Sequence, residues 1–180
     1  YAQENLDAAI RASGGYGNLS AERTLVAEGL GADPDELVFS YNTSDGMCQS
    51  LLGLDWQEGD VIVTTNHEHG GGNTPLNIAA DRYGIEINRV ELPTGETLPD
   101  GVTPHNAAWY YESFSERVRE LRSQGKRVRA LMWSSPTYLT GTMIPIPEMM
   151  QVCKENELIS IVDGAHLPGM MAYDYRELGM

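Results

Sequence analysis

Three short segments of the sequence hold most of the side chains that could bind a ligand or move a proton: 42–46 (NTSDG), 67–72 (HEHGGG) and 162–166 (VDGAH). Histidine can bind a metal ion or stack on a flat aromatic ligand. A carboxylate can hold a cation, and hydroxyls beside the free N–H groups at the start of a helix can hold a phosphate. Together these residue types predict a site for a ligand that is aromatic, charged or metal-bearing.

In the first segment, Thr43 and Ser44 stand where an expected strand passes into an expected helix. The free N–H groups and the dipole of a helix N-terminus attract anions, so this junction suits a phosphate group. Simple capping of the helix by a hydroxyl is the alternative, and the motif alone leaves both open.

In the second segment, His67 and His69 are separated by one residue and are followed by three glycines. On an extended chain this spacing puts both imidazoles on one face, where they can bind a metal ion or where one can stack on an aromatic ring. Glycine allows the backbone to approach a ligand closely. Two solvent-facing turn histidines are the remaining alternative.

In the third segment, Asp163 ends the apolar run 158–162. A buried carboxylate is costly unless it meets a cation or hydrogen-bond donors, which predicts a positive group nearby. A protonated pyridine nitrogen, a metal ion and a structural hydrogen-bond network all meet this requirement.

Alternating strands and helices must position these segments. Apolar stretches rich in valine and isoleucine predict strands at 36–41, 60–65, 85–92, 127–134 and 158–163. Amphipathic stretches predict helices at 20–30, 44–52, 73–83, 110–124 and 146–155. The alternation predicts an α/β fold with a mainly parallel sheet flanked by helices, and ligands of such sheets bind beyond the carboxyl ends of the strands. The longest predicted loop, 93–108, is a candidate lid or subunit contact.

The composition argues against several classes of protein. The 180 residues carry 26 acidic and 12 basic side chains, a formal net charge of −14, which argues against a nucleic-acid partner. No apolar run reaches the roughly 18 residues of a membrane span. Cys48 and Cys153 lack the spacing of metal ligands and are expected to be buried free thiols. The chain starts at Tyr1, so any targeting peptide is expected to have been lost upstream.

In their order and spacing, the segments resemble the class V aminotransferase family of fold type I pyridoxal phosphate (PLP) enzymes, which includes cysteine desulfurases and isopenicillin N epimerase-like proteins. The similarity runs from about residue 21 to the end. Its markers are 35–39 (DELVF) before 42–46, 59–63 (GDVIV) before 65–70 (TNHEHG), 140–146 (TGTMIPI) and 162–166. The resemblance implies that 21–180 is an incomplete part of an aspartate aminotransferase-like large domain, after an N-terminal segment 1–20.

The resemblance also implies roles for individual residues. Thr43 and Ser44 would hold the phosphate of pyridoxal 5′-phosphate, and His67 would stack on its pyridine ring. Asp163 would pair with the ring nitrogen N1 and keep it protonated, and His166 would reach the phenolic O3′, where desulfurases commonly have Gln. His67, Asp163 and His166 are thus the expected catalytic residues.

His69 and Tyr138 are expected to face the substrate. Around residues 135–138, desulfurases usually carry an Asn that contacts the cofactor, whereas this chain has Tyr138, and this departure favours the epimerase-like branch. The Schiff-base lysine of the family comes on a strand beyond 162–166 and is expected outside this chain, because Lys126 and Lys154 fit surface positions. The 180-residue piece alone is therefore expected to be inactive.

The leading hypothesis is a PLP-dependent enzyme that acts on an amino acid or an amino-acid-derived small molecule. Epimerase, lyase and aminotransferase activities stay open. By resemblance the enzyme is expected to be a homodimer, and it is expected in the cytoplasm or alternatively in the periplasm. One alternative is a metal-dependent hydrolase whose ligands are His67, His69 and Asp163, with His166 as a further ligand. Another is a non-catalytic α/β binding module.

Overall fold

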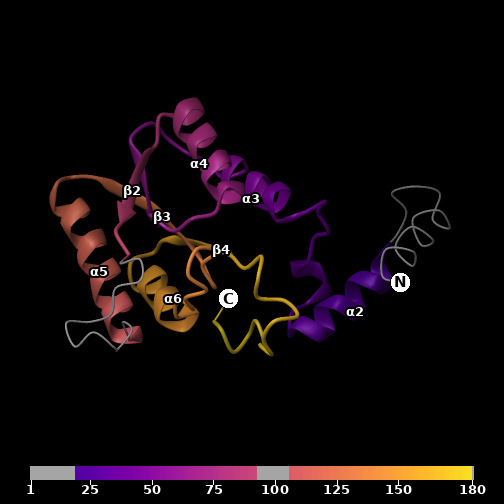
Figure 1. Cartoon of the computed structure of the whole chain (residues 1–180). Helices are drawn as coiled ribbons and strands as arrows, with labels where there is room; N and C mark the ends of the chain where they lie inside the picture. The colour runs from indigo at the N-terminus through magenta and orange to yellow at the C-terminus, as the bar shows by residue number, and fades with distance from the viewer. Residues whose placement is uncertain (1–18, 93–105, 180) are drawn as a thin grey trace. The chain divides into compact units, whose positions relative to one another are not determined.

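The computed structural model describes residues 19–92 and 106–179 (Figure 1). One unit contains the described residues up to Phe39 together with Tyr173–Leu178, and a second contains those of Ser40–Ala172 with Gly179. The predicted N-terminal segment 1–20 and the predicted loop 93–108 lie almost entirely outside the described residues, so both stay predictions.

The second unit is built on a sheet of four strands: β1 (Asp60–Thr65), β2 (Glu86–Val90), β3 (Arg127–Ser134) and β4 (Ile159–Asp163). Their order is β2-β1-β3-β4, and every neighbouring pair is parallel. β1 is buried over its whole length, as its continuous apolar run predicts for a parallel sheet that is covered on both faces. The predicted parallel α/β fold is confirmed.

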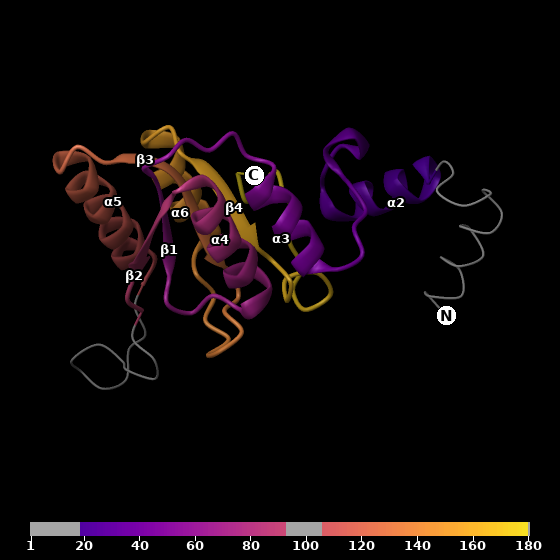
Figure 2. The same ribbon diagram turned by 90° about the horizontal axis from the view of Figure 1, so that it is seen from above.

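Helices cover both faces of this sheet: α3 (Thr43–Leu52), α4 (Gly70–Tyr83), α5 (Ala107–Ser123) and α6 (Ile146–Glu155). α3 packs against α4, and α5 packs against α6 (Figure 2). The chain passes from β1 to β2 at one edge and then crosses back to β3 and β4. Right-handed crossovers of this order put α4 on one face and α5 and α6 on the other. The change of direction between β1 and β3 creates the crevice in which such sheets bind ligands.

α4 and α5 each begin three residues earlier than the sequence predicts. α4 begins at Gly70 rather than at residue 73, and α5 begins at Ala107 rather than at residue 110. In each case the side chain of the residue before the helix accepts a backbone N–H of the first turn. This residue is His69 for α4 and Asn106 for α5. No helix within residues 19–92 and 106–179 is both long and apolar enough to cross a membrane.

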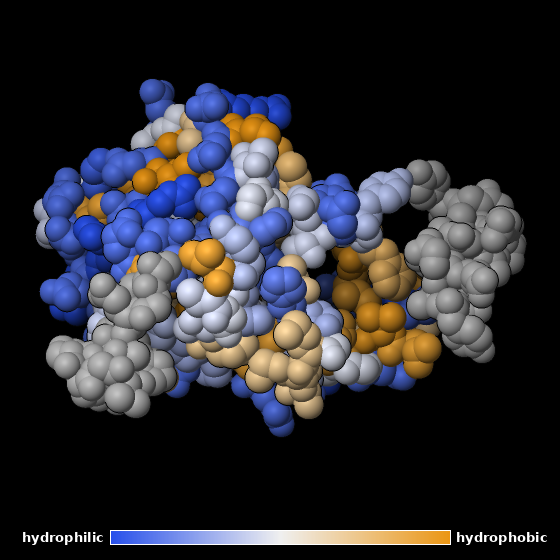
Figure 3. All heavy atoms as spheres, viewed as in Figure 1, coloured by the Kyte–Doolittle hydropathy of each residue, from blue (hydrophilic) through white to orange (hydrophobic). Residues whose placement is uncertain are grey.

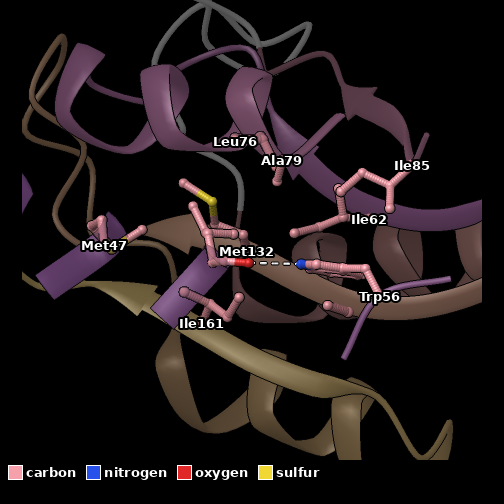
Figure 4. Packing of buried hydrophobic residues seen from close by; sticks show 10 residues of the cluster. Met47, Trp56, Ile62, Leu76, Ala79, Ile85, Met132 and Ile161 are labelled. Carbon is pink, nitrogen blue, oxygen red and sulfur yellow. Dashed lines mark hydrogen bonds between the residues drawn. The ribbon is translucent and has the colours of Figure 1, made fainter. Parts of the chain in front are cut away.

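The main hydrophobic core lies between the sheet and the helices α3 and α4 (Figure 4). Ile62 of β1 and Met132 of β3 pack beside Leu76 of α4, and all three are fully buried. The indole N–H of Trp56 donates to the backbone oxygen of Leu51 at 2.6 Å, so this polar group has a partner inside the core.

Replacing Ile62 by Ala is expected to lower the free energy of unfolding by about 3 kcal/mol, because it removes buried methyl groups and leaves a cavity. Chemical denaturation of the full-length protein measures this change. Ile78→Ala, at an exposed position of α4, is the control, with an expected change within about 0.5 kcal/mol. Equal losses in the two variants would contradict this assignment of the core.

The first unit holds α2 (Ser20–Leu30) and the short 3-10 helix η1 (Pro34–Glu36). Gly31 ends α2 at a φ of 70°, a left-handed conformation that glycine adopts without a clash of a Cβ atom. Asp33 and Glu36 cap η1 reciprocally, because each side chain accepts a backbone N–H. Hydrophobic side chains gather over α2 in Figure 3. The exposed large apolar residues of this unit are Leu25, Val26, Val38 and Phe39.

The strand predicted at 36–41 is wrong. Glu36 ends η1, and residues 37–40 take no regular structure. Val38 is 75% exposed and Tyr41 is 82% exposed, although their apolar character predicted burial. A strand needs a neighbour for its backbone N–H and C=O groups, and none of the four strands of the described sheet pairs with this run.

The two cysteines are free thiols, as expected from their spacing. Cys153 is buried in α6, and this burial raises the pKa of its thiol to about 12. Cys48 is only half-buried in α3, so the expectation that both thiols are buried is wrong for this residue. Since the thiolate is the reactive form, Cys153 is chemically inert near neutral pH.

Candidate functional site

A cavity of about 520 Å³ lies at the carboxyl ends of β3 and β4, beside the N-terminal ends of α3 and α4. Its lining residues come from four segments that are far apart in the sequence, within 42–44, 69–71, 134–138 and 163–166. A parallel sheet binds ligands at this edge, so this cavity is the candidate functional site.

Thr43 and Ser44 form the start of α3 and line the cavity. Asn42 supplies the cap of this helix, because its side-chain oxygen accepts the N–H of Asp45 at 2.9 Å. Both hydroxyls are therefore available at a helix N-terminus, where free N–H groups and the helix dipole favour an anion.

His69 lines the cavity and caps α4 at the same time. Its Nδ1 accepts the N–H of Gly71 at 3.0 Å. Nδ1 is an acceptor in this contact, so the proton of the neutral ring lies on Nε2. The ring also meets Tyr138 edge to face, with 5.1 Å between the ring centroids and an interplanar angle of 77°.

Gly71 allows the N-termini of α3 and α4 to approach each other. A Cβ atom at this position would lie 2.6 Å from the Ser44 hydroxyl oxygen and 3.2 Å from Nδ1 of His69. Any larger residue would therefore displace two side chains that line the cavity. The neighbouring Gly72 is buried, and its missing Cβ would lie 3.7 Å from Oδ2 of Asp163.

His67 does not line the cavity, although the sequence predicted that it would face a ligand together with His69. Asn66 and His67 form a turn directly after β1, so the alternation of an extended strand no longer applies. His67 is 3% exposed, and neither ring nitrogen has a hydrogen-bond partner among the described residues. The two histidines therefore lie in different surroundings.

The ligand set of the metal-dependent hydrolase alternative, His67, His69 and Asp163, is not brought together, because His67 and His69 lie in different surroundings. Within residues 19–92 and 106–179, no three His, Cys, Asp or Glu side chains lie close enough together to hold a metal ion. His69 and Asp163 reach the cavity, and His67 does not.

Asp163 is the last residue of β4 and lines the cavity, with only 5% of its surface exposed. Its Oδ1 accepts the N–H of Ala165 at 3.1 Å, and its backbone oxygen accepts the N–H of Ser135 at 3.0 Å. These bonds fix the carboxylate at the strand end. A buried carboxylate in this position favours a cationic partner in the cavity, as its apolar strand predicted.

Tyr138 and His166 complete the cavity lining that the sequence predicted. Tyr138 is 48% exposed and lies on a loop after β3, which is closed by the N–H of Thr137 donating to the oxygen of Thr142 at 2.9 Å. His166 is exposed, three residues beyond Asp163. Both side chains can therefore contact a ligand that enters from solvent.

Glu68 is a buried acidic residue to which the sequence analysis gave no role. It is 3% exposed, and its carboxyl accepts the hydroxyl of Thr65 at 2.5 Å and the hydroxyl of Ser134 at 2.6 Å. Burial raises the pKa of Glu68, and the nearby charge of Asp163 raises it further, while these hydrogen bonds oppose the shift. Ser134 lies 66 residues away, so no local sequence signal could have revealed this contact.

A protein-family model described as Aminotransferase class-V matches residues 15–180 of the chain. Among curated proteins, an L-cysteine desulfhydrase-like protein of Epichloe uncinata is 24% identical over 163 residues, which cover 89% of this chain and 32% of the relative. The isopenicillin N epimerase of Streptomyces clavuligerus is 23% identical over 152 residues, which cover 84% of this chain and 35% of that protein.

The fold also matches solved structures. One is a C-DES mutant with glycine covalently linked to the PLP cofactor, with 25% identity, a TM-score of 0.74 and coverage of 89% of this chain and 39% of that one. The chain thus spans about a third of the length of these curated relatives, 32% and 35% in the two cases above.

Proposed function

Since the chain belongs to the class V aminotransferase family, we propose that it forms part of the active site of a PLP-dependent enzyme acting on an amino acid or an amino-acid-derived substrate. The observation that carries this proposal is one cavity that combines a helix N-terminus bearing two hydroxyls, an imidazole and a buried carboxylate. These groups match the phosphate, the aromatic ring and the cationic nitrogen of PLP.

The N-terminus of α3 fits the phosphate group of PLP. Thr43 and Ser44 supply hydroxyl donors, and the first-turn N–H groups add donors and a favourable dipole. The missing side chain of Gly71 supports the fit, because a Cβ there would collide with the Ser44 hydroxyl. Thr43 and Ser44 therefore anchor the cofactor.

Asp163 fits the protonated ring nitrogen of PLP. When bound, PLP supplies an electron sink that stabilises negative charge at the α-carbon of the substrate. Asp163 holds the proton at N1 by charge, because a buried carboxylate strongly favours a cation beside it. His166 lines the same cavity and is assigned to the phenolic O3′.

His69 takes the place that the sequence gave to His67 beside the pyridine ring. The assignment rests on position, since His69 lines the cavity and His67 does not. Because Nδ1 of His69 accepts the N–H of Gly71, Nε2 is the nitrogen from which this ring can donate a proton. Tyr138 contacts His69 and is assigned to the substrate side of the cavity.

The names of the relatives support a lyase acting on a sulfur-containing amino acid. They include an L-cysteine desulfhydrase-like protein, a probable cysteine desulfurase of Pyrococcus abyssi and a hercynylcysteine sulfoxide lyase of Schizosaccharomyces pombe. An epimerase is the second candidate, because isopenicillin N epimerase is also similar to this chain. Aminotransferase activity is the third.

The lysine that binds PLP covalently is proposed to lie outside these 180 residues, in a longer homodimeric cytoplasmic enzyme. Lys126 pairs with Glu86 at the start of β3, the end of the strand opposite to the cavity. Lys154 lies in the last turn of α6. Neither lysine lines the cavity, so the 180-residue chain alone is expected to bind PLP without catalysing the reaction.

An absorption spectrum of the full-length protein tests the proposed function. The expected result is a visible band from bound PLP that disappears on reduction with borohydride, with the reduced adduct on a lysine outside residues 1–180. A colourless full-length protein that holds a stoichiometric metal ion instead would overturn the proposal. The same protein, once loaded with PLP, can be tested with cysteine and related amino acids for release of sulfur or pyruvate.

A further inference from the structure

Glu68 connects the loop after β1 to the end of β3. Thr65 Oγ1 accepts the N–H of His67 at 3.1 Å, so its own proton is directed to the Glu68 carboxyl. Ser134 offers two donors, its hydroxyl at 2.6 Å and its backbone N–H at 3.3 Å. Three donors from two strand ends thus converge on one buried carboxyl.

The backbone of Glu68 is held as well. Nδ2 of Asn73, in the first turns of α4, donates to the backbone oxygen of Glu68 at 2.6 Å. Glu68 is therefore fixed on one side to β3 through its carboxyl and on the other to α4 through its carbonyl. The next residue is His69, whose ring lies in the cavity.

The contact with Ser134 also brings Glu68 close to Asp163. Ser134 and Asp163 are paired residues in the register of β3 and β4. Burial raises the pKa of Glu68, and the charge of Asp163 adds to the shift. The hydrogen bonds from Thr65 and Ser134 favour the charged carboxylate of Glu68 and oppose this shift.

We propose that Glu68 is a positioning residue whose carboxyl group, bound to Thr65 and Ser134, holds the loop that carries His69 against the end of β3. Its importance for cofactor binding rests on the proposed function. The placement of the loop does not rest on the proposed function, because every contact that holds it lies within this chain.

Three variants and one control variant of the full-length protein test the proposal. Glu68→Ala leaves the hydroxyls of Thr65 and Ser134 without their buried acceptor, whereas the amide of Glu68→Gln can accept from Thr65 and donate to Ser134. Asp60→Asn is the matched control. Asp60 is a buried carboxylate at the start of β1, whereas Glu68 follows the end of β1, and Asp60 pairs with Arg127. Thr65→Val removes the hydroxyl that donates to Glu68, together with the acceptor of the His67 N–H, and serves if Glu68→Ala fails to fold.

The first measurement is hydrogen–deuterium exchange of peptides covering 66–73 in the cofactor-free protein. Glu68→Ala is expected to speed exchange there by about tenfold or more, Thr65→Val by less, and Glu68→Gln and Asp60→Asn little. The second is the PLP dissociation constant, expected to rise about tenfold in Glu68→Ala and to be restored in Glu68→Gln.

Unchanged exchange in both Glu68→Ala and Thr65→Val would overturn the proposal, as would a Glu68→Gln variant that is as mobile as Glu68→Ala. If exchange follows the expected order but the wild-type protein binds no PLP, the proposed function fails and the positioning role of Glu68 stands. The two ideas are therefore tested separately.

Discussion

Asp163→Asn is expected to lower kcat/KM of the full-length protein by about a thousandfold. Asparagine has nearly the same shape but no charge, so the cationic ring nitrogen that is proposed to face Asp163 would lose its charged partner, a loss of about 3–5 kcal/mol. The N–H of Ala165 keeps an acceptor in the asparagine oxygen, so the strand end should remain folded. Steady-state kinetics with the substrate found in the activity tests measures the effect.

The pH dependence and the spectrum of the bound cofactor separate this charge effect from a general loss of structure. In Asp163→Asn, the band of bound PLP should shift and its intensity should depend on pH in a range where the wild type is constant, because the ring nitrogen loses the charge that keeps it protonated. Asp60→Asn should reduce stability and leave the band unchanged, since Asp60 lies at the other end of the sheet. A fully active Asp163→Asn variant would contradict the pairing of Asp163 with the ring nitrogen.

Much of the sheet follows from the sequence because burial and apolar character coincide in it. The runs 60–65 and 127–134 were predicted with their observed bounds, since each has an apolar centre, at 61–63 and 130–133, of the kind that strands covered on both faces bury. The run 36–41 has the same character and is exposed. Apolar composition indicates a tendency to be buried, but the partner that completes a strand is a long-range property that no local window contains.

Some residues of the candidate site could likewise be predicted from a local sequence pattern, and others could not. The sequence singled out Asp163 because a carboxylate at the end of an apolar strand is unusual enough to signal a ligand. Asp163 lines the cavity, and its role there stays a prediction. The expectation that His67 and His69 face one ligand assumed an extended chain past Thr65, whereas the chain turns there and His69 rather than His67 lines the cavity. Glu68 could not be recognised at all, since its burial depends on Ser134 folding next to it.

His69→Ala and His69→Asn are expected to differ in stability and to agree in activity. In the wild type, Nδ1 of His69 caps α4 by accepting the N–H of Gly71. Asparagine is a favourable N-cap residue and can replace this acceptor, whereas alanine cannot, so only the alanine variant should lose about 1 kcal/mol of unfolding free energy. Chemical denaturation of the two full-length variants measures this difference.

Both substitutions remove the imidazole from the cavity, so both should lower kcat/KM by about a hundredfold or more if Nε2 donates a proton during the reaction. The comparison therefore separates the two roles of His69. An asparagine variant with near wild-type activity would restrict His69 to capping α4. The opposite outcome is an asparagine variant that is as stable as the wild type and yet inactive. That result would give His69 both roles, because the contact that caps α4 would also fix which nitrogen of the catalytic ring carries the proton.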